Sequence, residues 1–271
     1  MNQPRGNDHA ALTSSRPGAG HPALATESLT RHFGGLTAVN QVSIQCHPGQ
    51  IHAVIGPNGA GKSTLINLLS GELVPSSGKV LLDGEDVTAQ NPAQRSQRGL
   101  GRSYQKTNVF APLSVFENCR LAAQSRAGSS MRFFRPAASN REINQRALAA
   151  LVATGLEAAS ECIVATLSHG AQRQVEIAMT LATAPKVLLL DEPLAGMGAE
   201  ESAQVVALLN RLRGNHAILL IEHDMDAVFA LADRLTVMVN GNVLESGAPD
   251  AIRASPAVQA AYLGVDEITH G

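Results

Sequence analysis

The chain has 271 residues, of which 44% are hydrophobic and only 3% are aromatic. This length allows one large domain or a domain with two lobes, and the apolar fraction suffices for a sizeable core, so a chain that is disordered throughout is excluded. The net charge of -2 and the low number of aromatic side chains, six Phe and two Tyr, argue against nucleic-acid binding, and we expect no nucleic-acid partner.

Neither the N-terminal segment nor the cysteines of the chain indicate a secreted or membrane-spanning protein. Residues 1–26 are rich in Pro, Gly, Ala and Ser and lack the basic start and apolar run of a secretory signal, so we predict a disordered tail there and a second tail at residues 265–271. Cys46, Cys119 and Cys162 are odd in number and far apart, which favours reduced packing residues over disulfides or a metal site. No stretch approaches the ~18 consecutive apolar residues of a transmembrane helix. Membrane association is therefore expected only through a partner.

Short apolar segments alternate with helical patterns along the remaining chain. Two segments with period-2 patterning, at residues 36–44 and 79–82, each end in a turn signal and predict an antiparallel β layer. Continuous apolar runs predict buried strands at residues 51–55, 187–190 and 217–221. Helical patterns occupy residues 63–69, 172–181 and 200–212. This alternation predicts an α/β fold with a parallel sheet and crossover helices.

A separate helical lobe is predicted inside this α/β core. Residues 115–155 have a helical pattern, which a polar and basic stretch at residues 124–141 interrupts. The basic stretch is interpreted either as a solvated face or as a surface that docks on a membrane subunit.

The segment GPNGAGKST fits the phosphate-loop pattern G-x-x-x-x-G-K-[S/T] between an apolar strand and a helix. Its residues are Gly56, Pro57, Asn58, Gly59, Ala60, Gly61, Lys62, Ser63 and Thr64. The glycines let the backbone wrap around phosphates, and the first amides of the helix direct donors at the anion. Lys62 is expected to reach the β- and γ-phosphates, and the Ser63 hydroxyl to ligate Mg²⁺. A glycine-rich turn that carries a lysine by chance is the competing interpretation.

Acidic residues follow two of the predicted strands. Asp191 and Glu192 end one of them, and Glu222 and His223 follow another. Parallel strands bring such residues to the same edge of the sheet as a phosphate loop. We expect Asp191 to hold Mg²⁺ and Glu192 to orient and deprotonate the attacking water, while His223 senses the γ-phosphate. The alternative for the acidic pair is an exposed turn before Pro193.

Together these motifs resemble the ATP-binding cassette (ABC) family, because LSHGA at residues 167–171 is similar to the family signature LSGGQ. The resemblance implies that Ser168, His169 and Gly170 close over the γ-phosphate of ATP bound to an opposite subunit, so that the working unit is a dimer. His169 and Ala171 stand where the signature has Gly and Gln. Residues 195–198, AGMG, lie at the family's D-loop position and lack its usual Asp.

Three further residues match functional positions of the ABC family. Gln105 matches the Q-loop residue, which contacts Mg²⁺ and the attacking water and links the nucleotide to the helical lobe. Phe33 lies where the family has an aromatic residue that stacks on adenine, although a core Phe is the competing interpretation. His223 matches the switch histidine. The implied catalytic set is therefore Glu192, His223 and Gln105, with Ser63, Gln105 and Asp191 at the metal.

The resemblance implies a P-loop NTPase (RecA-like) core with an N-terminal antiparallel β layer and an inserted helical lobe that carries the signature. The ABC ATP-binding domain is expected at residues 27–264, with the helical lobe at about residues 106–170.

Segments such as FGGLTAVNQVS, DEPLAGM, IEHDM and AYLG narrow the resemblance to the LivG-type ATPases of branched-chain amino acid importers. This subgroup implies ATP hydrolysis with Mg²⁺ that powers import of branched-chain or other hydrophobic amino acids, at the cytoplasmic face of the inner membrane. The implied partners are permease subunits, a second ATP-binding subunit and, indirectly, an extracytoplasmic solute-binding protein. The alternatives are urea or amide import, lipopolysaccharide export, a soluble ABC ATPase without transport, and a subunit with weak hydrolysis.

Overall fold

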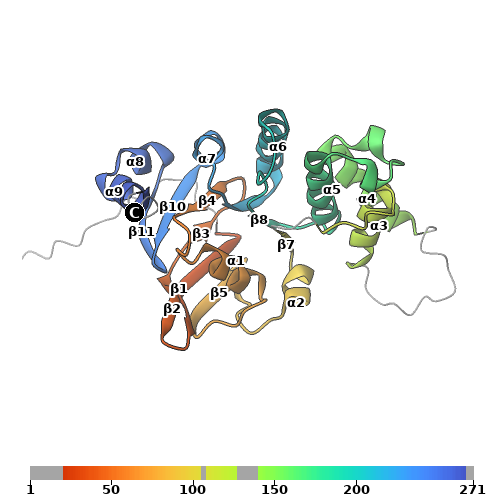
Figure 1. Cartoon of the computed structure of the whole chain (residues 1–271). Coiled ribbons are helices and arrows are strands. Elements are labelled where there is room, and N and C mark those ends of the chain that lie inside the picture. Colours follow the sequence, from red (N-terminus) through yellow and green to blue (C-terminus); the bar gives the residue numbers. More distant parts are fainter. Residues whose placement is uncertain (1–20, 105–107, 127–139, 267–271) are drawn as a thin grey trace, which may run out of the picture.

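The structure is a computed structural model of the chain and describes residues 21–104, 108–126 and 140–266. Figure 1 shows two sheets and their helices on one side of the molecule and a cluster of helices on the other. The expected P-loop NTPase architecture is confirmed, with an antiparallel sheet, a mainly parallel sheet and a helical lobe.

The antiparallel layer is a 5-stranded sheet in which β1 is central. Its strands are β1 Leu24–Phe33, β2 Leu36–Val42, β3 Gln45–Cys46, β5 Ser77–Leu82 and β6 Glu85–Asp86. The prediction of a tail at residues 1–26 is wrong at its end, because β1 begins at Leu24 and pairs with β2, β3 and β5. Ala23 and Leu24 are buried in the core. The strand therefore begins within a segment whose Pro-, Gly-, Ala- and Ser-rich composition predicted a tail. Residues 1–20 lie outside the described part of the chain.

The second sheet has 6 strands in the order β11-β10-β4-β9-β8-β7, and all neighbouring pairs except β10 with β11 are parallel. Its strands are β4 Ile51–Ile55, β7 Leu100–Ser103, β8 Val187–Asp191, β9 Ala217–Ile221, β10 Arg234–Val239 and β11 Asn242–Gly247. Every residue of β4, β8 and β9 is buried. This confirms the three predicted buried strands, since a sheet covered on both faces requires apolar side chains in both directions.

Helices cover both faces of the parallel sheet. They are α1 Lys62–Ser70, α2 Pro92–Gln97, α6 Ala199–Leu212, α7 Met225–Leu231, α8 Pro249–Ala254 and α9 Pro256–Asp266. Val54 of β4 faces a core shared with α1 and the antiparallel layer, whereas Ile51 and Ile55 face a core shared with α6, α7 and α8. The expected C-terminal boundary at residue 264 is also wrong, because α9 continues to Asp266. Residues 267–271 lie outside the described part of the chain.

The helical lobe consists of α3 Val115–Gln124, α4 Arg141–Thr154 and α5 His169–Ala182. Short 3₁₀ segments are Glu157–Ala159 and Val164–Thr166 near the lobe and Arg213–Asn215 after α6. Cys119, Leu151 and Val175 contribute one side chain from each helix to a separate apolar core. The predicted end of the lobe at about residue 170 falls in the first turn of α5, which stays in this core as far as Ala182. Residues 127–139 of the basic stretch lie outside the described residues.

Within the described ranges, no helix combines the length and the apolar character that a membrane span requires.

His52 is a fully buried polar residue in β4, at the centre of the sheet. Its Nδ1 lies 2.8 Å from the Gln45 carbonyl oxygen and its Nε2 lies 2.8 Å from the Thr236 hydroxyl. Because a carbonyl can only accept, Nδ1 carries a proton, and in the neutral ring Nε2 accepts from the Thr236 hydroxyl. Burial lowers the pKa of His52 to about 4 from an ordinary value of 6.5.

We predict that this histidine makes the fold sensitive to acid. His52 takes up a proton near pH 6.5 in the unfolded chain but only near pH 4 in the folded chain. The contribution of neutral His52 to the stability of the folded state is therefore complete above pH 6.5 and is lost as the pH falls towards 4. The loss from His52 between pH 7 and pH 5 should be about 2 kcal/mol. Urea unfolding at both pH values should show this loss in the wild type and in the exposed control His32→Gln, but not in His52→Gln. An equal loss in His52→Gln would contradict the assignment.

Candidate functional site

Three adjacent parallel strands end at one edge of the sheet and bring the predicted site together. In the sheet order, β9 lies between β4 and β8. The phosphate loop follows β4, Asp191 is the last residue of β8, and Glu222 follows β9. The strand ends therefore place the loop and the acidic residues on the same side of the sheet, as the sequence predicts.

The phosphate loop has a backbone that only glycine allows at two positions. Gly56 has φ 152° and Gly61 has φ 100°. A Cβ at Gly56 would lie 2.1 Å from the Met238 carbonyl oxygen, and one at Gly61 would lie 2.3 Å from the Ala38 carbonyl oxygen. The loop thus packs against neighbouring backbone while it turns into α1, whose first amides receive no side-chain cap. Those amides are donors suited to an anion.

Lys62 folds back over this loop. Its Nζ donates to the carbonyl oxygens of Gly56 at 2.6 Å and Pro57 at 3.0 Å. Burial lowers the pKa of Lys62, while Glu192 and Asp191 oppose the shift, so both carboxylates lie within electrostatic reach of the ammonium group. The lysine is therefore a half-buried positive charge between the loop and the acidic strand end.

A cleft of about 580 Å³ opens beside the loop, and we call it the nucleotide cleft. Besides residues 58–64 it is lined by Phe33, Leu36, Thr37, Ala38, Glu192, Asn240 and Gly241. Phe33 is 42% exposed at the end of β1, with the Arg31 guanidinium 4.7 Å from its ring centre. The alternative that Phe33 is a core residue is therefore wrong, and an aromatic face is available at the wall of the cleft.

The two acidic residues after β8 lie in different surroundings. Asp191 is 7% exposed, and burial raises its pKa although Arg102 lies 3.7 Å from its Oδ2. Glu192 lines the nucleotide cleft, and its Oε1 lies 3.8 Å from Nδ1 of His223. The alternative of an exposed acidic turn does not hold, because the first acid is buried and the second lines a cleft.

The chemistry of these side chains fits Mg²⁺ that is held together with a nucleotide. Mg²⁺ takes oxygen ligands and is commonly held by one or two carboxylates, with substrate phosphates and water completing the shell. Asp191 and Ser63 offer a carboxylate and a hydroxyl beside the loop, and the part of the chain that the structure describes holds no cluster of three or more metal-ligating side chains. A site of protein ligands alone is therefore absent from the described residues.

The signature segment lies at the start of α5 and not among the residues that line the nucleotide cleft. Ser168 caps the helix, with its Oγ accepting from the Ala171 amide at 3.3 Å. The Gly170 amide donates to Glu201 at 3.3 Å, and a Cβ at Gly170 would lie 2.6 Å from that carboxyl carbon. His169 lies beside them in the first turn. The chain thus brings the loop and the carboxylates together but leaves the signature elsewhere.

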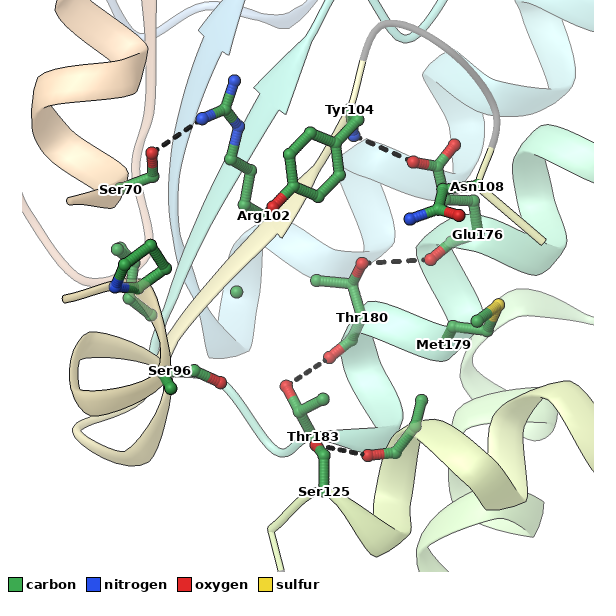
Figure 2. Close-up of a pocket in the computed structure, with 15 residues that line it drawn as sticks. Ser70, Ser96, Arg102, Tyr104, Asn108, Ser125, Glu176, Met179, Thr180 and Thr183 are labelled. Carbon is green, nitrogen blue, oxygen red and sulfur yellow. Dashed lines mark hydrogen bonds between the residues drawn. The ribbon is translucent and has the colours of Figure 1, made fainter. Parts of the chain in front are cut away.

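Gln105 lies outside the described residues, so the structure gives it no position. Tyr104 and Asn108, the described residues on either side of this gap, line a second cleft of about 500 Å³, which we call the interlobe cleft (Figure 2). Its walls include Ser96 of α2, Arg102 of β7, and Glu176 and Thr180 of α5.

Sequence reasoning gave no role to three charged residues that contact the site. Glu222 is buried, and its carboxylate accepts from the amides of Leu194 at 2.8 Å and His223 at 3.1 Å, which ties together the turns after β8 and β9. Arg102 and Arg173 contact Asp191 from β7 and α5. The position of Glu222 at a strand end was visible in the sequence although its role was not, whereas the contacts of the arginines depend on the packing of separate elements.

Comparison with known proteins identifies what this arrangement resembles. A family profile described as ABC transporter matches residues 39–195, and a profile described as branched-chain amino acid ATP-binding cassette transporter matches residues 242–268. The high-affinity branched-chain amino acid transport ATP-binding protein BraF of Pseudomonas aeruginosa is 37% identical over 250 residues, which cover 90% of this chain and 98% of BraF. The high-affinity branched-chain amino acid transport ATP-binding protein LivG of Escherichia coli K12 is 37% identical over 252 residues, which cover 90% of this chain and 98% of LivG.

The fold is similar to solved cassette structures. The ADP conformation of an ATP-binding cassette of an ABC transporter superposes with a TM-score of 0.80 at 30% identity, covering 90% of this chain and 99% of that one. A nucleotide-free cassette gives a TM-score of 0.79 at 29% identity.

We predict that Lys62→Ala weakens ATP binding by about tenfold or more, because a charged hydrogen-bond donor to phosphate is lost. Equilibrium titration with a fluorescent ATP analogue measures the effect, with the exposed Lys79→Ala as the matched control. An affinity within twofold of the wild type would contradict the role expected for Lys62.

Proposed function

This chain belongs to the ABC transporter family, and from that premise we propose that it powers the import of branched-chain or other hydrophobic amino acids. It is the ATP-hydrolysing subunit of an ABC importer, as the family match and the relatives over nearly its whole length indicate. The observation that carries the proposed cargo is the match of residues 242–268 to a branched-chain amino acid transporter profile. This segment contains β11, α8 and α9, and Ile252 and Val258 are buried in the core of the parallel sheet.

In the proposed site, ATP binds in the nucleotide cleft. Phe33 stacks on the adenine, residues 56–64 wrap the phosphates, and Lys62 contacts the β- and γ-phosphates. The exposed ring of Phe33 and the uncapped amides of α1 support this placement. Ser63, Asp191 and Gln105 hold Mg²⁺, which supplies positive charge to the phosphate oxygens.

Glu192 is the proposed general base for the attacking water. Its carboxylate lines the nucleotide cleft within electrostatic reach of Lys62, as a base that acts beside bound phosphate requires. The proposed contact of His223 with the γ-phosphate is supported by the 3.8 Å distance between its Nδ1 and Oε1 of Glu192. Gln105 is proposed to contact the same water.

We propose that the second half of each ATP site comes from a second ATP-binding subunit, which is either a copy of this chain or a different one. Ser168, His169 and Gly170 are absent from the lining of the chain's own cleft, which supports a contact across a dimer. The dimer would then alternate between a closed state with bound ATP and an open state after hydrolysis. A membrane subunit docked on the dimer can change conformation together with it.

The interlobe cleft is the proposed docking site for permease subunits. It lies between the helical lobe and the β7 edge of the parallel sheet, and it is lined by both polar and apolar side chains (Figure 2). A partner inserted there would contact both lobes at once. We propose that the chain lies peripherally at the cytoplasmic face of the inner membrane, and that a solute-binding protein contacts the permease from the other side.

We predict that Glu192→Gln binds ATP and traps a closed dimer but loses at least 100-fold in kcat, because the amide cannot accept a proton from water. Steady-state hydrolysis and size-exclusion chromatography with ATP measure both effects. Glu200→Gln, at an exposed position in the first turn of α6, is the matched control and should behave as the wild type. Normal turnover in Glu192→Gln would refute the assignment of the base.

We predict that the tagged chain co-purifies with permease subunits and a second ATP-binding protein from gently solubilised native membranes. Ala93→Arg places a large cation on the wall of the interlobe cleft and should abolish this recovery, whereas Ala153→Arg, exposed on α4, should preserve it. Binding of leucine, urea and amides to the associated solute-binding protein then tests the cargo. Recovery of an active chain without membrane proteins would favour a non-transport ATPase.

A further inference from the structure

Arg173 and Glu176 form a buried ion pair on α5 to which the proposed function assigns no role. Their exposed fractions are 2% and 4%, and Arg173 Nη1 lies 2.6 Å from Glu176 Oε2. Both side chains come from the helix that carries the signature at its start. Removing both charges of such a pair from water costs free energy. We therefore ask what the other contacts of the two side chains do.

One side of the pair holds the end of β8. Arg173 Nη2 donates to the carbonyl oxygens of Asp191 at 2.8 Å and Glu192 at 3.2 Å. Glu192 has φ 47°, a left-handed conformation that is unfavourable for a residue with a side chain and persists only where the surroundings hold it. Its amide donates to the Ile221 carbonyl oxygen at 2.9 Å. Arg173 therefore supplies part of the restraint that sets the backbone of the proposed base.

The other side of the pair holds the end of β7. The Tyr104 amide donates to Glu176 Oε1 at 2.8 Å, and the Tyr104 carbonyl oxygen accepts from Arg173 Nη1. Tyr104 and Glu176 both line the interlobe cleft, where Figure 2 shows the contact between them. The two polar backbone groups of Tyr104 are thus bound by the same ion pair that binds the carbonyls of Asp191 and Glu192.

We propose that Arg173 and Glu176 are positioning residues for ATP hydrolysis, which link the wall of the interlobe cleft at Tyr104 to the backbone of Glu192. The inference rests on the proposed function, since it takes Glu192 as the base. A shift of Tyr104 changes the position of the Arg173 guanidinium and hence the hydrogen bond to the Glu192 carbonyl. A partner in the cleft therefore acts on the base without touching the nucleotide.

The first test replaces the whole pair by apolar side chains in the full-length chain. Arg173→Met with Glu176→Met leaves no unpaired buried charge, and such replacements are commonly tolerated in stability. We expect a melting temperature close to that of the wild type, an ATP affinity within threefold, and a kcat lowered at least tenfold. The matched control is Arg146→Met with Glu142→Met, which removes an exposed ion pair from α4 and should leave kcat unchanged.

Two conservative variants keep the test valid if the double variant unfolds. Arg173→Lys retains a buried cation that can reach some of the same acceptors, and it should recover part of the kcat lost in Arg173→Met at unchanged KM. Glu176→Gln retains an acceptor for the Tyr104 amide but loses the charge, and it should lower kcat by less than the double variant does.

The possible outcomes distinguish a failure of the positioning role of Arg173 and Glu176 from a failure of the proposed base, Glu192. A folded double variant with wild-type kcat, or an Arg173→Lys variant with kcat no higher than that of Arg173→Met, would overturn the positioning role. If Glu192→Gln itself turns over normally, the proposed base is wrong and the failure lies there. Loss of kcat in both Glu192→Gln and the double variant, with ATP binding retained, is the result that the inference requires.

Discussion

The site depends on the parallel pairing of β4, β9 and β8, whose carboxyl ends meet at one edge of the sheet. Parallel strands need crossover connections, and the helices of those crossovers cover both faces of the sheet, which is why every residue in these three strands is buried. Apart from His52, whose ring nitrogens are both hydrogen-bonded, the polar side chains of these three strands therefore lie where the strands end. The phosphate loop, the acidic pair and His223 are all products of that constraint.

Buried polar side chains then fix the turns that leave this edge. Glu222 binds the amides that follow β8 and β9, and Arg173 binds the carbonyls of the last residue of β8 and of Glu192. Arg102 approaches Asp191 from β7. Each of these groups is charged and largely removed from water, so each requires several partners, and the same contacts that satisfy it hold a loop in one conformation.

The helical lobe is a separate packing unit with its own apolar core, yet it is joined to the sheet through charged contacts at α5. The signature at the start of that helix does not line the nucleotide cleft of its own chain. In the proposed dimer, the signature of a partner subunit completes the ATP site, and hydrolysis would then depend on the association of two subunits. A membrane partner at the proposed docking site in the interlobe cleft would contact both lobes.

The sequence by itself determined the phosphate loop, the three buried strands, the acidic pair and the helices that begin or end near them, because each is encoded by neighbouring residues. The strand β1 within the supposed tail and the extension of α5 into the lobe core were decided by packing, since Leu24 and Ala182 are buried by elements distant in sequence. The same holds for Arg173. A lone arginine after the signature carries no local signal, and only the tertiary structure brings it to Tyr104 and Glu192, because those residues follow separate strands, β7 and β8.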